Sequence, residues 1–142
     1  MSKEEIEIKE IVDRETKAWN TLDVDLLISI FHPDMVWPWP KTSSSHDPMD
    51  WELVLGKFNK DKWSKGWLDL FEHYRLANNV REIKKIVISN DKDGAFAVVD
   101  IDTLWIGKDN NNTIHWKGCV CKVYSKIEDD WKMIMHTGVL EY

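Results

Sequence analysis

Cysteine is scarce in this sequence. Only Cys119 and Cys121 occur among 142 residues, which is too few for a disulfide framework. They lie two positions apart in one predicted strand, where a disulfide between such neighbours would be strained. We therefore expect free thiols and a cytoplasmic location. Each thiol is either buried and inert or, with a base such as His115 beside it, a nucleophile.

A metal-ligand pattern is also missing. No second Cys or His pair follows the two cysteines at a useful spacing, and the histidines are scattered along the chain. These histidines are His32, His46, His73, His115 and His136. We expect neither a metal nor another cofactor.

Long apolar runs and an excess of positive charge are absent as well. Without a stretch of about 18 apolar residues, we predict no membrane span, and the charged segment Met1–Glu5 does not resemble a signal peptide. Lys and Arg number 19 against 25 Asp and Glu, a formal net charge of −6. This balance argues against nucleic acid as a partner. We expect one soluble domain spanning residues 1–142.

Tryptophan, by contrast, is abundant, with nine residues. The helical period predicts a first helix over Lys3–Asn20, with an apolar stripe that includes Trp19. Glu15 falls in the middle of this stripe. Its carboxylate lies either at the edge of the stripe, reaching solvent, or towards an internal cavity, where loss of water would raise its pKa.

Other aromatic residues cluster in two segments. A helix that begins near Asp61 carries an aromatic face at helical spacing. That face consists of Trp63, Trp67, Leu70, Phe71 and Tyr74. Trp37 and Trp39 alternate with two prolines, which predicts an edge strand with both indoles on one side. Both groups are consistent either with core packing or with the walls of a ligand pocket.

The C-terminal half reads as antiparallel strands. We predict strands at Val80–Ser89, Ala95–Ile106, Thr113–Tyr124 and Trp131–Thr137, joined by turn sequences such as Asp93-Gly94. Helices followed by a run of hairpins predict an α+β fold, in which a curved antiparallel sheet wraps over the N-terminal helices. Such curvature leaves a concavity in which a ligand could lie.

One face of this sheet carries most of the polar side chains. Asp100 and Asp102 share a face because side chains alternate along a strand. With a register centred on Asn110, they lie beside His115, Lys117, Cys119 and Cys121, and the last strand adds Met133, Met135 and Thr137. We expect this face to line the concavity. Alternatively, Asp100 and Asp102 pair with Lys117 or Lys122 in a salt-bridge network on the outer face, at a dimer interface.

Several segments resemble the nuclear transport factor 2-like superfamily, in its polyketide cyclase SnoaL-like branch. They are Ala18–Asn20 followed by Asp23, Phe31–Trp37, and Tyr124–Lys126 with Asp130–Ile134. The resemblance implies a cone-shaped, cystatin-like roll with a pocket between helices and sheet, and homodimers through the outer face of the sheet. Many members carry His at the positions of Met135 and Thr137, whereas here His136 lies between them.

Two functions follow as hypotheses. In the first, an acid–base enzyme of the isomerase, dehydratase or cyclase type acts on a small hydrophobic substrate. Asp100 would be the base, Glu15 its partner, and His115 or Tyr74 the donor. The substrate would lie against a further set of residues: Trp19, Trp37, Trp39, Trp67, Phe71, Tyr74, Asp102, Cys119 and Met135.

In the second hypothesis, the chain is a non-catalytic binding or association module. The sheet face would then mediate dimerisation, and acidic groups in an aromatic pocket would favour a cationic ligand. A carboxylate that titrates well above its ordinary pKa in a closed cavity would favour the enzyme.

Overall fold

A computed structural model describes residues 1–40, 48–53 and 57–139, and only the backbone at Trp39, Pro40 and Pro48. The helices are α1 (Lys3–Asn20), α2 (Val24–Ser29) and α3 (Lys60–His73), with a 3-10 turn, η1 (Pro48–Asp50). The strands are β1 (Phe31–Val36), β2 (Trp39–Pro40), β3 (Trp51–Glu52), β4 (Tyr74–Ile88), β5 (Gly94–Gly107), β6 (Thr113–Ile127) and β7 (Asp130–His136).

Helix α1 has the bounds that the sequence predicts, and a capping box fixes its start. The Ser2 hydroxyl accepts a hydrogen bond from the Glu5 amide, and the Glu5 carboxylate accepts one from the Ser2 amide. Helix α3 is shorter than its aromatic period suggests, because Tyr74 already pairs with Gly107 at the start of the long β4–β5 ladder. Pairing along the whole of β4 outweighs helical continuation there.

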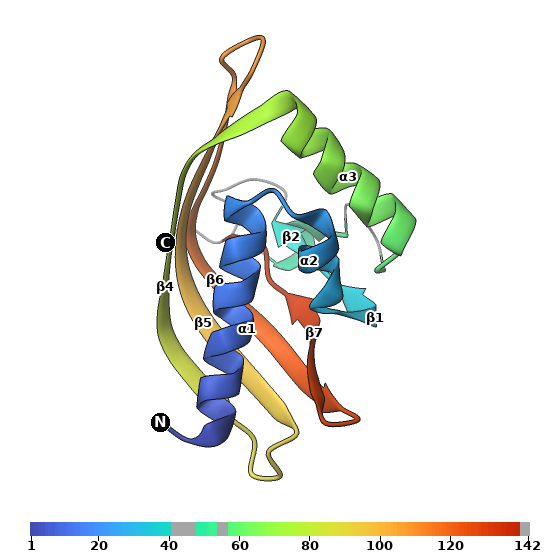
Figure 1. The fold of residues 1–142 in the computed structure, drawn as a ribbon, viewed down its shortest axis with the longest axis vertical. Helices are drawn as coiled ribbons and strands as arrows, with labels where there is room; N and C mark the ends of the chain where they lie inside the picture. Colours follow the sequence, from blue (N-terminus) through green and yellow to red (C-terminus); the bar gives the residue numbers. More distant parts are fainter. Residues whose placement is uncertain (41–47, 54–56, 140–142) are drawn as a thin grey trace.

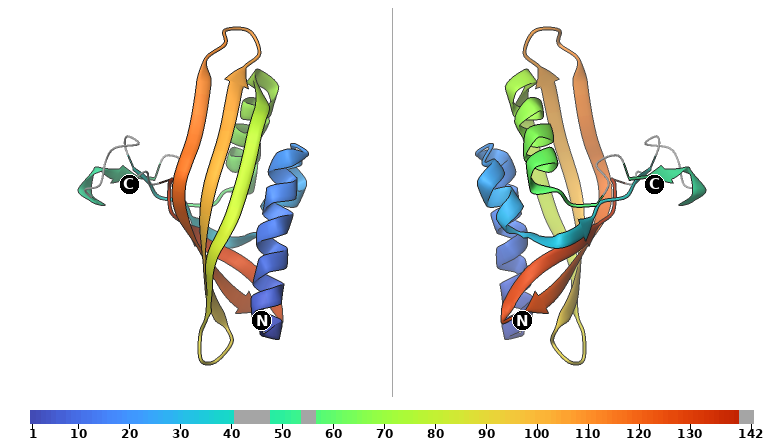
Figure 2. Two further views of the ribbon diagram at one scale, coloured as in Figure 1. Left: turned by 90° about the vertical axis from the view of Figure 1, so that its left-hand side faces the viewer. Right: turned by 90° about the vertical axis from the view of Figure 1, so that its right-hand side faces the viewer.

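The main sheet has the strand order β1-β7-β6-β5-β4. Strands β4 to β7 are antiparallel neighbours, as predicted, whereas β1 runs parallel to β7. The sheet curves around α1, and all three helices lie on its concave side (Figure 1). Seen from the side, α1 runs along one face of β4–β6, while none of the described helices lies on the other face (Figure 2). The predicted α+β cone is therefore confirmed.

The predicted register between β5 and β6 is correct, but the predicted face is wrong. Asp100 does lie opposite Cys119, and Asp102 opposite Lys117. However, the alternate row of β5 points at the helices. That row, entirely buried, is Ala95, Ala97, Val99, Ile101, Thr103 and Trp105. It carries no charge and therefore packs on the apolar stripe of α1, which leaves the two aspartates on the outer face.

A β-bulge changes the expected pattern in β7. The register shifts between Val123 and Tyr124, so that Tyr124 pairs with Met133 while Val123 pairs with Met135. Met133 is buried and Met135 is only half-buried, so the two do not share a row as predicted. The shift also brings His136 opposite Lys122 and turns it towards the helices.

Candidate functional site

The middle of α1 places Glu15 inside the protein. Glu15 is 1% exposed, so its carboxylate does not reach solvent at the edge of the apolar stripe. The carboxylate accepts hydrogen bonds from Trp19 Nε1 at 3.0 Å, Arg81 Nη1 at 3.1 Å and Lys122 Nζ at 2.6 Å. Burial alone would raise the pKa of Glu15, but the charges of Lys122 and Arg81 lower it by more. The expected raised pKa is therefore wrong, and Glu15 is ionised at neutral pH.

Lys122 reaches Glu15 from β6 and is 0% exposed. It lies opposite Ala97 in the buried row of the sheet, so its stem crosses the core before its ammonium group meets the carboxylate. Burial lowers the pKa of Lys122 to about 8, although the Glu15 charge opposes that change. The second neighbour of Nζ is the Nε2 atom of His136, 3.0 Å away.

The partners of His136 define its tautomer. Its Nδ1 atom lies within hydrogen-bond distance of the carbonyl oxygen of Thr137, which only accepts, so Nδ1 carries the proton and Nε2 accepts from Lys122. The imidazole stacks on the Trp37 indole with ring centroids 4.1 Å apart. Burial, followed by the charge of Lys122, holds the pKa of His136 well below 6.5. His136 is therefore a buried, neutral imidazole.

Arg81 completes what we call the charged cluster: Glu15, Arg81, Lys122 and His136. The Arg81 side chain is buried, donates from Nε to Asn79 Oδ1 at 3.0 Å and from Nη1 to Glu15, and lies 5.7 Å from the Trp19 ring centre. Asn79 is itself held by the Thr103 hydroxyl at 2.8 Å. These contacts fix the guanidinium plane above the indole.

The charged cluster borders a small cavity. Its walls are Glu15, Trp19, Trp37, Arg81, Ile101, Trp116, His136 and Val139, and its volume is ≈ 10 Å³. That volume is about the room that one water molecule needs. A larger ligand can therefore enter only if side chains of the wall move.

The aromatic residues predicted to bind a ligand fall into two groups. Trp19 and Trp37 line the cavity. Trp67 and Phe71 are buried in the core behind it, with the Trp67 ring 5.0 Å from that of Trp19, and Tyr74 is half-buried against the same core. The side chain of Trp39 lies outside the described residues. The aromatic face of α3 is thus mainly core.

The remaining predicted site residues lie on the outer face of the sheet. The Asp100 side chain is 50% exposed and 3.9 Å from Lys84, and Asp102 accepts a hydrogen bond from His115 Nε2 at 2.7 Å, which lowers the pKa of Asp102. Their expected place in the concavity is wrong, since the uncharged row of β5 occupies it. Cys119, opposite Asp100, and Met135 are half-buried on the same outer face.

Sequence reasoning missed three members of the charged cluster. Lys122 could have been found, because the uncharged row of β5 identifies the inner face and the register then turns Lys122 inward. Arg81 and His136 depend on bulges, between Leu76 and Asn78 and between Val123 and Tyr124. A bulge shifts which side chains point inward without leaving a clear mark in the sequence.

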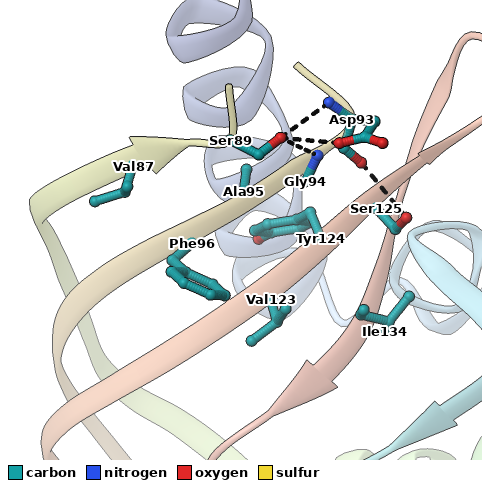
Figure 3. A pocket seen from close by; sticks show the side chains of 10 residues that line it. All are labelled: Val87, Ser89, Asp93, Gly94, Ala95, Phe96, Val123, Tyr124, Ser125 and Ile134. Carbon is teal, nitrogen blue, oxygen red and sulfur yellow. Dashed lines mark hydrogen bonds between the residues drawn. The ribbon is translucent and has the colours of Figure 1, made fainter. Parts of the chain in front are cut away.

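An apolar groove lies on the outer face near the β4–β5 hairpin (Figure 3). Val87, Phe96, Val123 and Ile134 supply its apolar side chains, and its volume is ≈ 310 Å³. At one end, the Ser89 hydroxyl accepts hydrogen bonds from the Asp93 and Gly94 amides and donates to the Asp93 carboxylate. These bonds close the hairpin and shape the end of the groove.

The fold is that of the nuclear transport factor 2-like and cystatin-like proteins. A ketosteroid isomerase-like protein from Erwinia carotovora atroseptica superposes with a TM-score of 0.71 and 17% identity, covering 96% of this chain and 95% of that one. A nuclear transport factor 2-like superfamily protein from Salmonella enterica serovar Typhimurium gives 0.65 and 16%, with 97% and 92% covered.

A third solved structure is described as a candidate calcium/calmodulin-dependent kinase II association domain from Exiguobacterium sibiricum. It matches with a TM-score of 0.69 and 8% identity, over 100% of this chain and 96% of that one. No family model and no curated protein matches this sequence. These structural matches establish the fold, as the sequence resemblance implied. Their low sequence identities leave the activity open. None of the described helices is both long and apolar enough to cross a membrane.

Proposed function

We propose that this chain is a small-molecule-binding domain whose ligand occupies the cavity bordered by Glu15, Arg81 and His136 after side chains of the cavity wall have moved aside. Where the ligand is a substrate, the chemistry would be proton transfer of the isomerase, dehydratase or cyclase type. The name of the ketosteroid isomerase-like structure is in keeping with this class, although a shared fold does not fix an activity.

The observation that carries the proposal is the burial of ionised groups beside a cavity. A buried ion pair contributes little net stability, because removal of water from both charges offsets their attraction. Groups with strongly shifted pKa values in a hollow are, in contrast, typical of functional sites. The charged cluster combines both features, and it borders indoles that offer a flat apolar surface.

We assign proton transfer to Lys122 and His136 in place of Asp100, which lies on the outer face. Glu15, with its lowered pKa, holds no proton to give at neutral pH. Lys122, with a pKa of about 8, is the member suited to exchange a proton near neutrality. Nε2 of His136 would take this proton from Lys122, to which it is hydrogen-bonded, leaving Lys122 neutral and His136 an imidazolium. Because Nδ1 faces the Thr137 carbonyl, the ring would then turn so that Nε2–H faces the ligand in the cavity that His136 borders, donates the proton and becomes neutral again.

The test compares His136→Gln with His115→Gln, a matched change on the exposed outer face. Small aromatic compounds are screened by thermal shift against wild type, and the ligands found are then incubated in D₂O and followed by proton NMR for exchange of acidic C–H groups. We expect His136→Gln to weaken binding and abolish exchange, and His115→Gln to preserve both. Equal behaviour of the two variants would contradict the proposal.

A second candidate function is association of two copies through the outer face, as the family resemblance implies. Phe96 is 50% exposed and lies opposite the exposed Val87 in the β4–β5 ladder, an apolar patch of the kind that marks interfaces. Light scattering coupled to size exclusion should give the mass of a dimer for wild type and of a monomer for Phe96→Lys. Leu68→Lys, at an exposed position on α3, should remain a dimer. A monomeric wild type would exclude this function.

A further inference from the structure

The charged cluster carries a surplus of positive charge. Glu15 contributes one negative charge, Arg81 and Lys122 contribute one positive charge each, and His136 is neutral, which leaves a net charge of +1. Among the described residues, Glu15 is the only acid that contacts either cation of the cluster. The chain as a whole has a formal net charge of −6, so the net charge of the buried cluster is opposite in sign to that of the protein.

Arg81 also has hydrogen-bond donors to spare. A guanidinium has five N–H groups, and Arg81 uses one towards Asn79 and one towards Glu15. Three remain without an acceptor among the described residues, although the side chain is only 4% exposed. Arg81 borders the cavity, and a buried guanidinium with unused donors is the group that best matches a carboxylate.

We propose that the ligand of this cavity is an organic anion, a carboxylate or an enolate, whose negative end pairs with Arg81 and whose apolar part lies against the indoles. This inference rests on the proposed function and adds the chemical class of the ligand. It reverses the expectation of a cationic ligand, because the acid at this site is already matched by Lys122. An added anion brings the cluster to neutrality, which is favourable in a buried place.

Small ligands of one shape and different charge provide the test. Acetate, propionate and benzoate are compared with acetamide, propionamide and benzamide by calorimetry at pH 7, and indole N–H signals in nitrogen–proton NMR spectra locate the site. We expect each carboxylate to bind at least tenfold more tightly than its amide. Benzylamine should not bind. The comparison uses the wild-type chain, so it does not depend on the folding of a variant.

Variants then test whether Arg81 causes the preference for carboxylates over amides. Arg81→Lys retains the charge and loses the planar fork, so we expect the preference for benzoate over benzamide to fall several-fold. Arg75→Lys, at an exposed position on the same strand, is the control and should leave it unchanged. Amides or benzylamine that bind as well as carboxylates, with binding weakened by His136→Gln, would overturn the anion proposal and retain the site. No binding by any probe would overturn the proposed function itself.

Discussion

The ammonium nitrogen of Lys122 lies 2.6 Å from Oε1 of Glu15, although 107 positions separate the two residues in the chain. This contact joins the middle of α1 to β6 through the core, and both side chains are almost without solvent exposure. The ion pair therefore links the stability of the helix–sheet interface to the protonation of the candidate site.

Glu15→Gln should destabilise the fold strongly. The amide has nearly the same shape as the carboxylate, but it leaves Lys122 and Arg81 as buried cations without a counter-charge. Breaking a buried pair from one side costs on the order of 3–5 kcal/mol, so we expect a loss in that range in the free energy of unfolding measured with urea. Asp13→Asn is the matched control, because Asp13 lies on the same helix and pairs with Lys9 at an exposed position.

The control should unfold at nearly the wild-type urea concentration, since an exposed pair on a helix surface contributes little. A Glu15→Gln protein as stable as the control would mean that the cluster is hydrated in solution, and the argument for a desolvated site would fail.

The loss of folding stability at acid pH should depend on His136. Its pKa in the folded protein lies well below the ordinary 6.5, so as pH falls through 6.5 the unfolded chain takes up a proton that the folded chain does not. Stability must then decrease with falling pH, by at most about 1.4 kcal/mol per pH unit for one such group. Urea unfolding of wild type between pH 7 and 5 should show this decrease.

In His136→Gln, the decrease in stability that His136 causes between pH 7 and 5 should disappear. His115→Gln should retain this decrease. Below pH 4.5 a further loss should follow in both variants, because the pKa of Glu15 is also lowered in the folded protein. An acid limb that is the same in His136→Gln and in wild type would show that His136 is accessible to protons in the native state.

The outer-face residues that sequence reasoning favoured should be dispensable for the cavity. Asp100→Asn changes a half-exposed side chain whose cation neighbour, Lys84, is also exposed. We expect wild-type unfolding by urea and wild-type affinity for any cavity ligand. A loss of ligand binding in Asp100→Asn, with an unchanged oligomeric mass, would indicate that the ligand binds on the outer face of the sheet.

The architecture was readable from the sequence because it follows from strong periodic signals. The α1 stripe, the Asp93-Gly94 turn and the alternation along β5 each point to one local structure, and they are mutually consistent. The register around Asn110 was also correct, since the turn fixes which residues of β5 and β6 face each other.

The site was only partly readable, for two physical reasons. The inner face of a sheet is chosen by what packs on it, and polar residues such as Asp100 drew attention to the wrong row. The uncharged row ending in Trp105 was the better signal, because helices require an apolar surface. The bulges that deliver Arg81 and His136 are tertiary features, and spacing along the chain does not reveal them.

Lys122→Met should be less costly than Glu15→Gln, although both remove the same ion pair. After Lys122→Met, the cluster is neutral and Oε2 of Glu15 still accepts from Trp19 and Arg81. Oε1 of Glu15 and Nε2 of His136 each lose a donor, and a buried acceptor left unsatisfied costs about 1–3 kcal/mol. After Glu15→Gln, the surplus of positive charge doubles. Urea unfolding of both variants at pH 7 should therefore give a clear asymmetry, with Lys122→Met the more stable protein. Equal losses would indicate that the surplus charge costs the folded protein nothing, because the cluster is hydrated in solution. The preference for an anion would then lose its basis.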